Sequence, residues 1–264
     1  YAADSKVATT AADSGSIVNA DALSYALGHG GSVTLESAAI QALPDATPPS
    51  AMDSFSAGNG VRFGTDTQVL KSQGGSATLA VNSARNIIME PGSSLASSSG
   101  ALNVDFNADA KGSLVVDGRP GGAIAMDRAS IQSNGGNIRF YGQGDPVNGR
   151  AAGGSQSGPY AKGNGLDLEG IRLADSLVST CAPGQESCGG GGSISLRGHG
   201  GTVQPSVGSI GNSGVGIALY GSTLQTGSGT IAVDGAGGIG ASGVISDFTQ
   251  GGNSAIGWRF GDIP

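Results

Sequence analysis

Short segments in which apolar and polar residues alternate recur along the chain, and each follows a glycine. Residues 74–82 read GGSATLAVN, residues 100–109 read GALNVDFNAD, residues 135–144 read GGNIRFYGQG and residues 227–235 read GSGTIAVDG. Alternation with a period of two buries one face of a β-strand and leaves the other face in water. The chain therefore contains nearly the same half-buried strand several times.

The repeated unit can be aligned on one apolar anchor residue in each copy. Each anchor is followed by glycine at +5 and by apolar residues at +7 and +9, and it is preceded by an apolar pair such as Val61 and Phe63. A fifth copy, at 170–180 and 191–198, fits if the residues between its halves are an insertion. This alignment predicts a core that includes four anchors and the residues that follow them: Leu70, Leu95, Ile131, Leu224, Ile138, Phe140, Ile231 and Val233.

The spacing of the units favours a stack of equivalent coils. It is constant within a unit and varies between units, and the variation falls in polar, Gly-rich segments such as 145–164 and 201–214. One coil cannot bury its own apolar face, whereas a stack of coils forms a continuous core. We therefore predict an all-β fold, a right-handed parallel β-helix (solenoid) with loop insertions at its corners. A Gly-rich antiparallel sandwich or jelly roll is the alternative.

We expect the whole chain to form a single β-helix segment. Its expected parts are N-terminal coils over 1–58 with a short helix at 21–27, regular coils over 59–144, a coil with long insertions and a cysteine loop over 145–214, and terminal coils over 215–264. In the short helix, Asn19 or Asp21 can cap a turn that ends at Gly28. Ala22, Leu23 and Ala26 are the residues expected to pack there.

Composition and charge limit the possible partners. The chain has 264 residues, 50 of them Gly, and 12% charged residues with a formal net charge of -7. It contains no Lys/Arg cluster, so we expect no nucleic-acid partner and no anionic membrane surface as partner. No apolar run reaches the roughly 18–20 residues of a membrane span, which predicts that there is no transmembrane segment. The chain begins at Tyr1, so we expect a processed protein or a fragment.

Three stretches resemble a known family. Residues 121–144 (GGAIAMDRASIQSNGGNIRFYGQG), 214–238 (GVGIALYGSTLQTGSGTIAVDGAGG) and 16–37 (SIVNADALSYALGHGGSVTLES) are similar to the coils and recurrent short helix of filamentous-haemagglutinin-like exoproteins. These are adhesins secreted by the two-partner route. The resemblance implies a secreted or bacterial cell-surface protein that works in adhesion, biofilm matrix, haem-carrier capture or toxin delivery.

From the coils and this resemblance we expect an adhesin or biofilm-matrix scaffold that is not an enzyme and carries no cofactor. Its expected partners are an outer-membrane transporter of the two-partner pathway and a host or bacterial surface glycan or protein. The alternative is a dedicated binder of one partner protein, of the haem-carrier capture type, acting through loops such as 145–164 and 176–192.

The two cysteines predict one disulfide bond. Cys181 and Cys188 enclose APGQES, in which Pro183-Gly184 is typical of a type II turn. Such a turn brings two Cα atoms within bonding range, and a metal site would need further Cys or His ligands nearby. We therefore expect a closed loop and no metal. The loop either pins an insertion so that its coil stays in register or presents a rigid knob to a partner.

A polysaccharide lyase or hydrolase is a more remote alternative. Such an enzyme needs carboxylates gathered on one face with a basic residue nearby. The candidates are Asp105, Asp109, Asp117, Asp127, Lys111, Arg119 and Arg128. Asp105 alternates with Val104 and Phe106, so we expect it to point outward on a solvated acidic face. His29 and His199 both lie in Gly-His-Gly-Gly, which we interpret as two equivalent corner positions and not as a catalytic pair.

Overall fold

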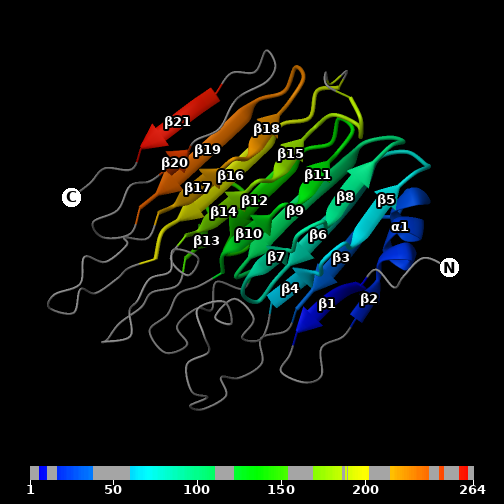
Figure 1. The fold of residues 1–264 in the computed structure, drawn as a ribbon, viewed down its shortest axis with the longest axis horizontal. Coiled ribbons are helices and arrows are strands. Elements are labelled where there is room, and N and C mark those ends of the chain that lie inside the picture. Colours follow the sequence, from blue (N-terminus) through cyan, green and yellow to red (C-terminus); the bar gives the residue numbers. More distant parts are fainter. Residues whose placement is uncertain are drawn as a thin grey trace, which may run out of the picture.

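The chain winds into a three-sided parallel β-helix. The structure, a computed structural model, describes residues 6–10, 17–37, 60–110, 122–153, 169–185, 188, 190–201, 215–237, 244–246 and 256–260. Each of the five complete coils contributes one strand to sheet A, then one to sheet C and then one to sheet B, and the coils follow one another along the axis in sequence order (Figure 1). The predicted parallel stack of coils is confirmed, and the sandwich is not observed.

Three sheets run along the solenoid axis, and their strands lie in the following spatial order. Sheet A contains β2 (Ile17–Asn19), β1 (Lys6–Thr10), β4 (Gly60–Phe63), β7 (Ile87–Met89), β10 (Ile124–Asp127), β14 (Ile171–Ala174), β17 (Ile217–Tyr220) and β20 (Val244–Ser246). Sheet C contains β18 (Thr223–Gln225), β15 (Leu177–Ser179), β11 (Ser130–Gln132), β8 (Ser94–Ser97) and β5 (Gln68–Lys71). Sheet B contains β21 (Ile256–Phe260), β19 (Ile231–Ala236), β16 (Ile194–His199), β12 (Ile138–Gly142), β9 (Leu102–Ala108), β6 (Ala77–Asn82) and β3 (Val33–Glu36), and β13 (Ala151–Ala152) also pairs with β16.

Neighbouring coils pair in parallel and in register, so equivalent residues lie above one another. In sheet B, Val104 pairs with Ile138, which pairs with Ile194, which pairs with Ile231. This register aligns the inward rows of successive coils into one continuous apolar core. Because the side-chain period of a strand is two, a slip by one residue would turn every inward residue outward, and the core therefore fixes the register.

The core is filled by aliphatic rows and by three phenylalanines. The ring of Phe106 lies between Phe63 and Phe140, with centroids 5.8 Å and 5.0 Å away and interplanar angles of 19° and 8°. All three rings are fully buried. The predicted core residues that lie in this core are Leu95, Ile131, Leu224, Ile138, Phe140, Ile231 and Val233.

The prediction for Leu70 is wrong. Leu70 is 45% exposed, whereas its neighbour Val69 is 0% exposed and is the Cα partner of Leu95. The first regular coil has one more residue between its anchor and Ala77 than the next coil has between Leu95 and Leu102. Counting back from Ala77 by the spacing of the other coils therefore gave Leu70 in place of Val69.

The extra residue belongs to a corner that surrounds a buried lysine. Lys71 is 0% exposed, and its Nζ donates to the carbonyl oxygen of Gln73 at 3.0 Å, to that of Gly74 at 3.4 Å and to that of Ser99. Three carbonyl acceptors therefore satisfy the three N–H donors of the ammonium group. Burial lowers the pKa of Lys71.

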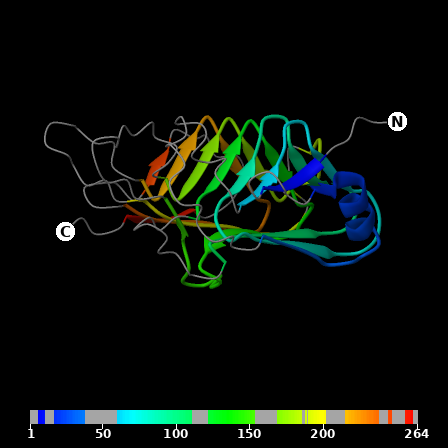
Figure 2. The same ribbon diagram turned by 90° about the horizontal axis from the view of Figure 1, so that it is seen from below.

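A short helix takes the place of a sheet C strand at the N-terminal end of the stack. Helix α1 (Ala20–Gly28) begins after Asn19, whose side chain accepts from the N–H groups of Asp21 and Ala22, and it lies beside β5 (Figures 1 and 2). The helix is one residue longer at each end than predicted. Leu23 packs inward as predicted, but Ala22 is exposed and the other buried side chains are Ala20 and Leu27.

The first strand departs from the parallel pattern. β1 pairs antiparallel with both β2 and β4, so it covers the edge of β4 in sheet A. The Oγ of Ser24 in α1 accepts from the N–H of Leu70 at 3.0 Å, which gives an acceptor to a donor on the edge of β5. These contacts satisfy backbone groups that a bare solenoid end would expose.

Candidate functional site

The disulfide loop replaces one corner between sheets C and B. Cys181 and Cys188 are bonded, as predicted, with their Cα atoms 4.3 Å apart. The N–H of Gln185 donates to the carbonyl oxygen of Ala182 at 3.2 Å, and Gly184 has a φ of 75°, as a type II turn requires at its third residue. Cys181 is 1% exposed while the turn is exposed, so the loop is anchored in the coil and presents its tip to solvent.

The disulfide coil lacks a hydroxyl hydrogen bond that three other coils make at this corner. Two residues after the anchor, the hydroxyl of Ser133 donates to the carbonyl oxygen of Gly136 at 2.6 Å, and Ser97 bonds Gly100 at 2.7 Å in the same way. Thr180 occupies this position in the disulfide coil, and its buried Oγ1 has no hydrogen-bond partner among the described residues. The corner that carries the disulfide loop is therefore built differently from those of the neighbouring coils.

A second ordered loop joins β12 to β13 and stands on sheet B. The carboxylate of Asp145 accepts from the N–H groups of Val147 at 2.8 Å and Asn148 at 3.0 Å. The hydrogen bonds from Asn148 and Val147 lower the pKa of Asp145. Val147 at the tip is 66% exposed. This loop projects from the flat sheet as the green loop in Figure 2.

Two arginines fix this loop to the sheet. The guanidinium of Arg150 donates to both carboxylate oxygens of Asp234 at 3.0 Å, and Arg197 lies 2.7 Å from the same carboxylate. Arg197 also donates to the carbonyl oxygen of Val147. The loop tip is thus connected to β16 and β19 by charged hydrogen bonds, which are stronger than neutral ones.

The candidate catalytic carboxylates are not grouped at one place on the β-helix. Asp105 points outward from β9 as expected, but it is only 9% exposed because Arg139 on β12 covers it with two hydrogen bonds of 2.6 Å. The expected solvated acidic face is wrong at this position, since the carboxylate is paired. Asp109 directly follows β9 and is 2% exposed. Asp117, Lys111 and Arg119 lie outside the described residues.

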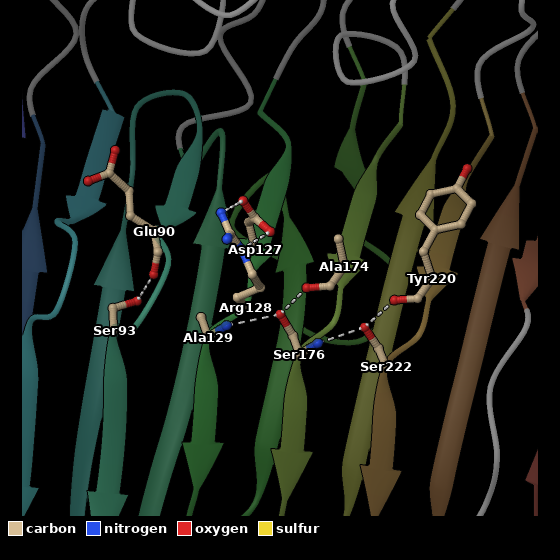
Figure 3. A network of polar contacts seen from close by, with 9 residues as sticks. All are labelled: Glu90, Ser93, Asp127, Arg128, Ala129, Ala174, Ser176, Tyr220 and Ser222. Carbon is tan, nitrogen blue, oxygen red and sulfur yellow. Dashed lines mark hydrogen bonds and ion pairs between the residues drawn. The ribbon is translucent and has the colours of Figure 1, made fainter.

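Asp127 and Arg128 lie elsewhere, at the corner between sheets A and C. Figure 3 shows the guanidinium of Arg128 facing the carboxylate of Asp127, with Nε to Oδ1 at 3.3 Å. Asp105 belongs to sheet B, so the structure separates it from this pair. Arg128 has a φ of 47°, a conformation that costs an L-residue about 1–2 kcal/mol.

Positive φ recurs at this corner in each of the five complete coils. The residues concerned lie three positions before the anchors: Asp66, Gly92, Arg128, Asp175 and Gly221. The next residue is a serine or threonine in four of the coils and Ala129 in the third. The Oγ of Ser222 accepts from the N–H of Ser176 at 3.1 Å, and the Oγ of Ser176 accepts from that of Ala129 at 3.2 Å (Figure 3). These buried hydroxyls connect successive coils.

A buried carboxyl group on sheet A was missed by the sequence analysis. Glu169 is 4% exposed; the hydroxyl of Tyr220 donates to it at 3.1 Å and the guanidinium of Arg172 at 3.4 Å. The guanidinium carbon of Arg172 also lies 5.2 Å from the centroid of the Tyr220 ring. Burial raises the pKa of Glu169 despite these two donors. The fifth coil copy begins one residue later, at Gly170, so no repeat position indicated this residue.

The two histidines do not occupy equivalent corners, which corrects that interpretation. His29 follows α1, where its Nδ1 lies 2.8 Å from the carbonyl oxygen of Tyr25 and the two rings contact each other with centroids 3.9 Å apart. His199 ends β16 in sheet B. Their shared Gly-His-Gly-Gly sequence therefore stands in two different local structures.

No family model matches the chain, and no curated protein and no solved structure shows significant similarity to it. Among the described residues, no three His, Cys, Asp or Glu side chains are grouped so that they could hold a metal ion. In the same residues, no helix has the length and apolarity to cross a membrane. The surfaces on which a partner could bind are the disulfide loop, the β12–β13 loop and the outward sides of the three sheets.

Proposed function

We propose that the chain is a segment of a secreted bacterial surface exoprotein that acts as an adhesin or biofilm-matrix scaffold. The observation that carries this proposal is the in-register stack of five complete coils from which two loops project. Continuous hydrogen bonding along three sheets makes such a stack stiff. Length, stiffness and loop surface are the properties that attachment uses.

The disulfide bond supports secretion, because such bonds persist in oxidising compartments and are rare in the cytosol. Export through an outer-membrane transporter of the two-partner pathway rests on the resemblance of residues 16–37, 121–144 and 214–238 to that family. The partner at the surface is then a host or bacterial glycan or protein.

We further propose that the chain turns over no substrate. Asp105 and Asp127 lie on different sides of the β-helix, and each is paired with an arginine. A glycosidase needs its two carboxyl groups within roughly 5–10 Å of each other and one of them protonated. Asp105 and Asp127 do not form such a pair, which supports a binding role over a lyase or hydrolase.

A dedicated binder of one partner protein is the second candidate. It is favoured by the two loops that are fixed independently, one by the Cys181–Cys188 bond and one by Arg150 and Arg197. Rigid loops lose little conformational entropy on binding, which raises affinity for a single partner. The exposed Val147 would be the apolar contact of the second loop.

Deletion of the parent gene tests the proposal. We expect weaker cell–surface attachment or biofilm cohesion and unchanged growth on polysaccharides. Complementation with the wild type or with Asp127→Asn should restore attachment, whereas Val69→Asp, which disrupts the core, should not. Unchanged attachment together with loss of one captured protein would favour the second candidate. Release of reducing or unsaturated sugars by the purified protein, dependent on Asp105 or Asp127, would contradict both.

A further inference from the structure

Sheet C has an outward face without charge. Its ten outward positions form two rows along the solenoid axis: Gln68, Ser94, Ser130, Leu177 and Thr223, and Leu70, Ala96, Gln132, Ser179 and Gln225. Ala96 and Ser179 are covered by their neighbours, at 8% and 0% exposed, and the other eight positions are open to solvent. None of these side chains is ionisable, although the chain carries a formal net charge of -7. The described strands of the other sheets carry outward charges, such as Arg62 on sheet A and Asp105 on sheet B. We call the ten positions face C.

Face C offers hydrogen-bonding groups in a regular array. The hydroxyl of Ser94 donates to the amide oxygen of Gln68, and the hydroxyl of Ser179 donates to that of Gln225 at 3.1 Å. These contacts tie the amide oxygens of both glutamines to the adjacent strand. Gln132, half-buried on the middle strand, makes no side-chain hydrogen bond among the described residues. Its amide is a donor and an acceptor presented at the centre of the face.

An aromatic ring extends the face at its N-terminal end. Leu23 in α1 points into the core, and Ser24 points sideways to β5 through its contact with Leu70. Successive side chains on a helix are separated by about 100°, so Tyr25 points outward on the same side as face C. Tyr25 is 68% exposed and Leu70 is 45% exposed. Among the described residues, the other large exposed hydrophobic side chain is Val147.

The Tyr25 ring packs against the ring of His29. Its contact with the His29 ring, together with the contact of His29 Nδ1 with the carbonyl oxygen of Tyr25, fixes one ring face against the imidazole and leaves the other to solvent. A rigid aromatic surface loses little entropy when a ring packs on it, and aromatic residues are enriched among binding hot spots.

We propose that Tyr25 and face C bind an extended, uncharged polysaccharide that lies along the solenoid axis. This inference rests on the proposed function and names the class of its surface ligand. A sugar ring has apolar C–H faces that pack on Tyr25 and Leu70, and equatorial hydroxyls that pair with the amide of Gln132 and the hydroxyl of Ser130. Strands repeat about every 4.8 Å along the axis, close to the length of one sugar unit in an extended chain.

Charge selects against other ligands. An anionic polysaccharide would meet no cation on face C and would approach a protein of net charge -7. A positively charged ligand would lose its hydration on face C and would find no carboxylate there to pair with. An uncharged chain with many hydroxyl groups matches both the missing charge and the array of amides and hydroxyls.

Co-sedimentation and affinity electrophoresis test the proposal with stated probes. The purified chain is titrated with amorphous cellulose, chitin, mannan and dextran, and with alginate and polygalacturonate as anionic probes. We expect binding to at least one uncharged probe and to neither anionic one. Tyr25→Ala should weaken that binding at least about fivefold, in line with an aromatic contact. Gln132→Glu should weaken it further, because it removes the amide N–H donor and adds a carboxylate that must lose hydration when the chain covers it.

The matched control is Ser195→Glu, which places the same charge on the outward side of sheet B. It should leave binding unchanged, and all variants should keep the wild-type far-UV circular dichroism spectrum and melting temperature. The proposal is overturned if no uncharged probe binds, if an anionic probe binds more tightly, or if Tyr25→Ala and Gln132→Glu bind as the wild type does. If cells that carry these two variants still attach normally, face C is not the surface that binds the ligand, while the proposed attachment function is unaffected.

Discussion

Val69 and Leu70 are adjacent in sequence, and the structure predicts opposite responses when each is replaced by aspartate. Val69 is 0% exposed in the core, and Leu70 is 45% exposed on face C. Val69→Asp removes a buried side chain worth about 1.5–3 kcal/mol. It also buries a carboxyl group without a partner, at a further cost of several kcal/mol.

The sum for Val69→Asp, at least about 5 kcal/mol, is comparable with the whole stability of a typical domain of 5–15 kcal/mol. We therefore expect this variant to lose the first regular coils or to unfold. Leu70→Asp adds a charge that water can solvate, so its effect should remain within about 1 kcal/mol. Urea denaturation followed by far-UV circular dichroism measures both variants against the wild type.

The reasoning fails if Leu70→Asp is the more destabilising change, because the strand would then present the opposite face to the core. It also fails if both variants lose equal stability, because inward and outward side chains of β5 should respond differently to a charge. Gln68→Asp, also on face C, serves as a second exposed control and should behave as Leu70→Asp does.

Three further predictions concern single groups. Burial raises the folded-state pKa of Glu169, so the wild type loses stability as the pH rises from the unfolded-state pKa of Glu169, about 4.3, through the raised value. Glu169→Gln does not titrate, so its free energy of unfolding in urea, relative to that of the wild type, should increase from pH 4 to pH 7. A difference that stays constant with pH would contradict the raised pKa. Arg128→Gly should raise stability by about 0.5–1 kcal/mol, because glycine adopts its φ of 47° without strain, and a lower melting temperature would contradict this. Reduction of Cys181–Cys188 should cost about 2–3 kcal/mol and leave the circular dichroism spectrum unchanged, and loss of the β signal would show that the coils depend on the loop.

The sequence allowed the coil architecture to be predicted because one strand pattern recurs with a fixed internal spacing. Apolar alternation located the inward residues of sheet B, including Ile138, Phe140, Ile231 and Val233. Burial of these rows requires stacking, and stacking explains the variable insertions. The disulfide bond was predictable for a different reason, since two cysteines around a Pro-Gly turn have few other ways to pair.

The error at Leu70 has a physical cause that a second motif would have corrected. The residue three positions before each observed anchor has positive φ, and in four of five coils the next residue is serine or threonine. Asp66 and Thr67 satisfy this pattern only if the anchor is Val69. The glycine at +5 could not distinguish the two anchors, because residues 74 and 75 are both Gly. The corner that surrounds Lys71 is one residue longer, which shifted the count from Ala77.

Other features depend on contacts that no local pattern encodes. Glu169 is recognisable as a buried acid only when Tyr220, 51 residues away, lies beside it. Asp105 looked like part of a solvated face until Arg139, 34 residues away, was placed on the adjacent coil. Face C likewise emerges only when ten residues from five coils are superimposed. These contacts depend on which residues of adjacent coils lie beside each other, so they can be predicted once the register of the stack is known.

The central claim is that coils stack in parallel with Ser94 beside Ser130, and one cross-linking measurement tests it directly. These residues are Cα partners on β8 and β11 and point outward, with strands about 4.8 Å apart. In the variant with cysteine at both positions, a thiol cross-linker spanning about 5–6 Å should join them within one chain, as peptide mass spectrometry would show. Cysteines at Ser94 and Thr223, three strands apart in sheet C, should remain unlinked. No link between positions 94 and 130, or equal linking of both pairs, would contradict the parallel register and the faces derived from it.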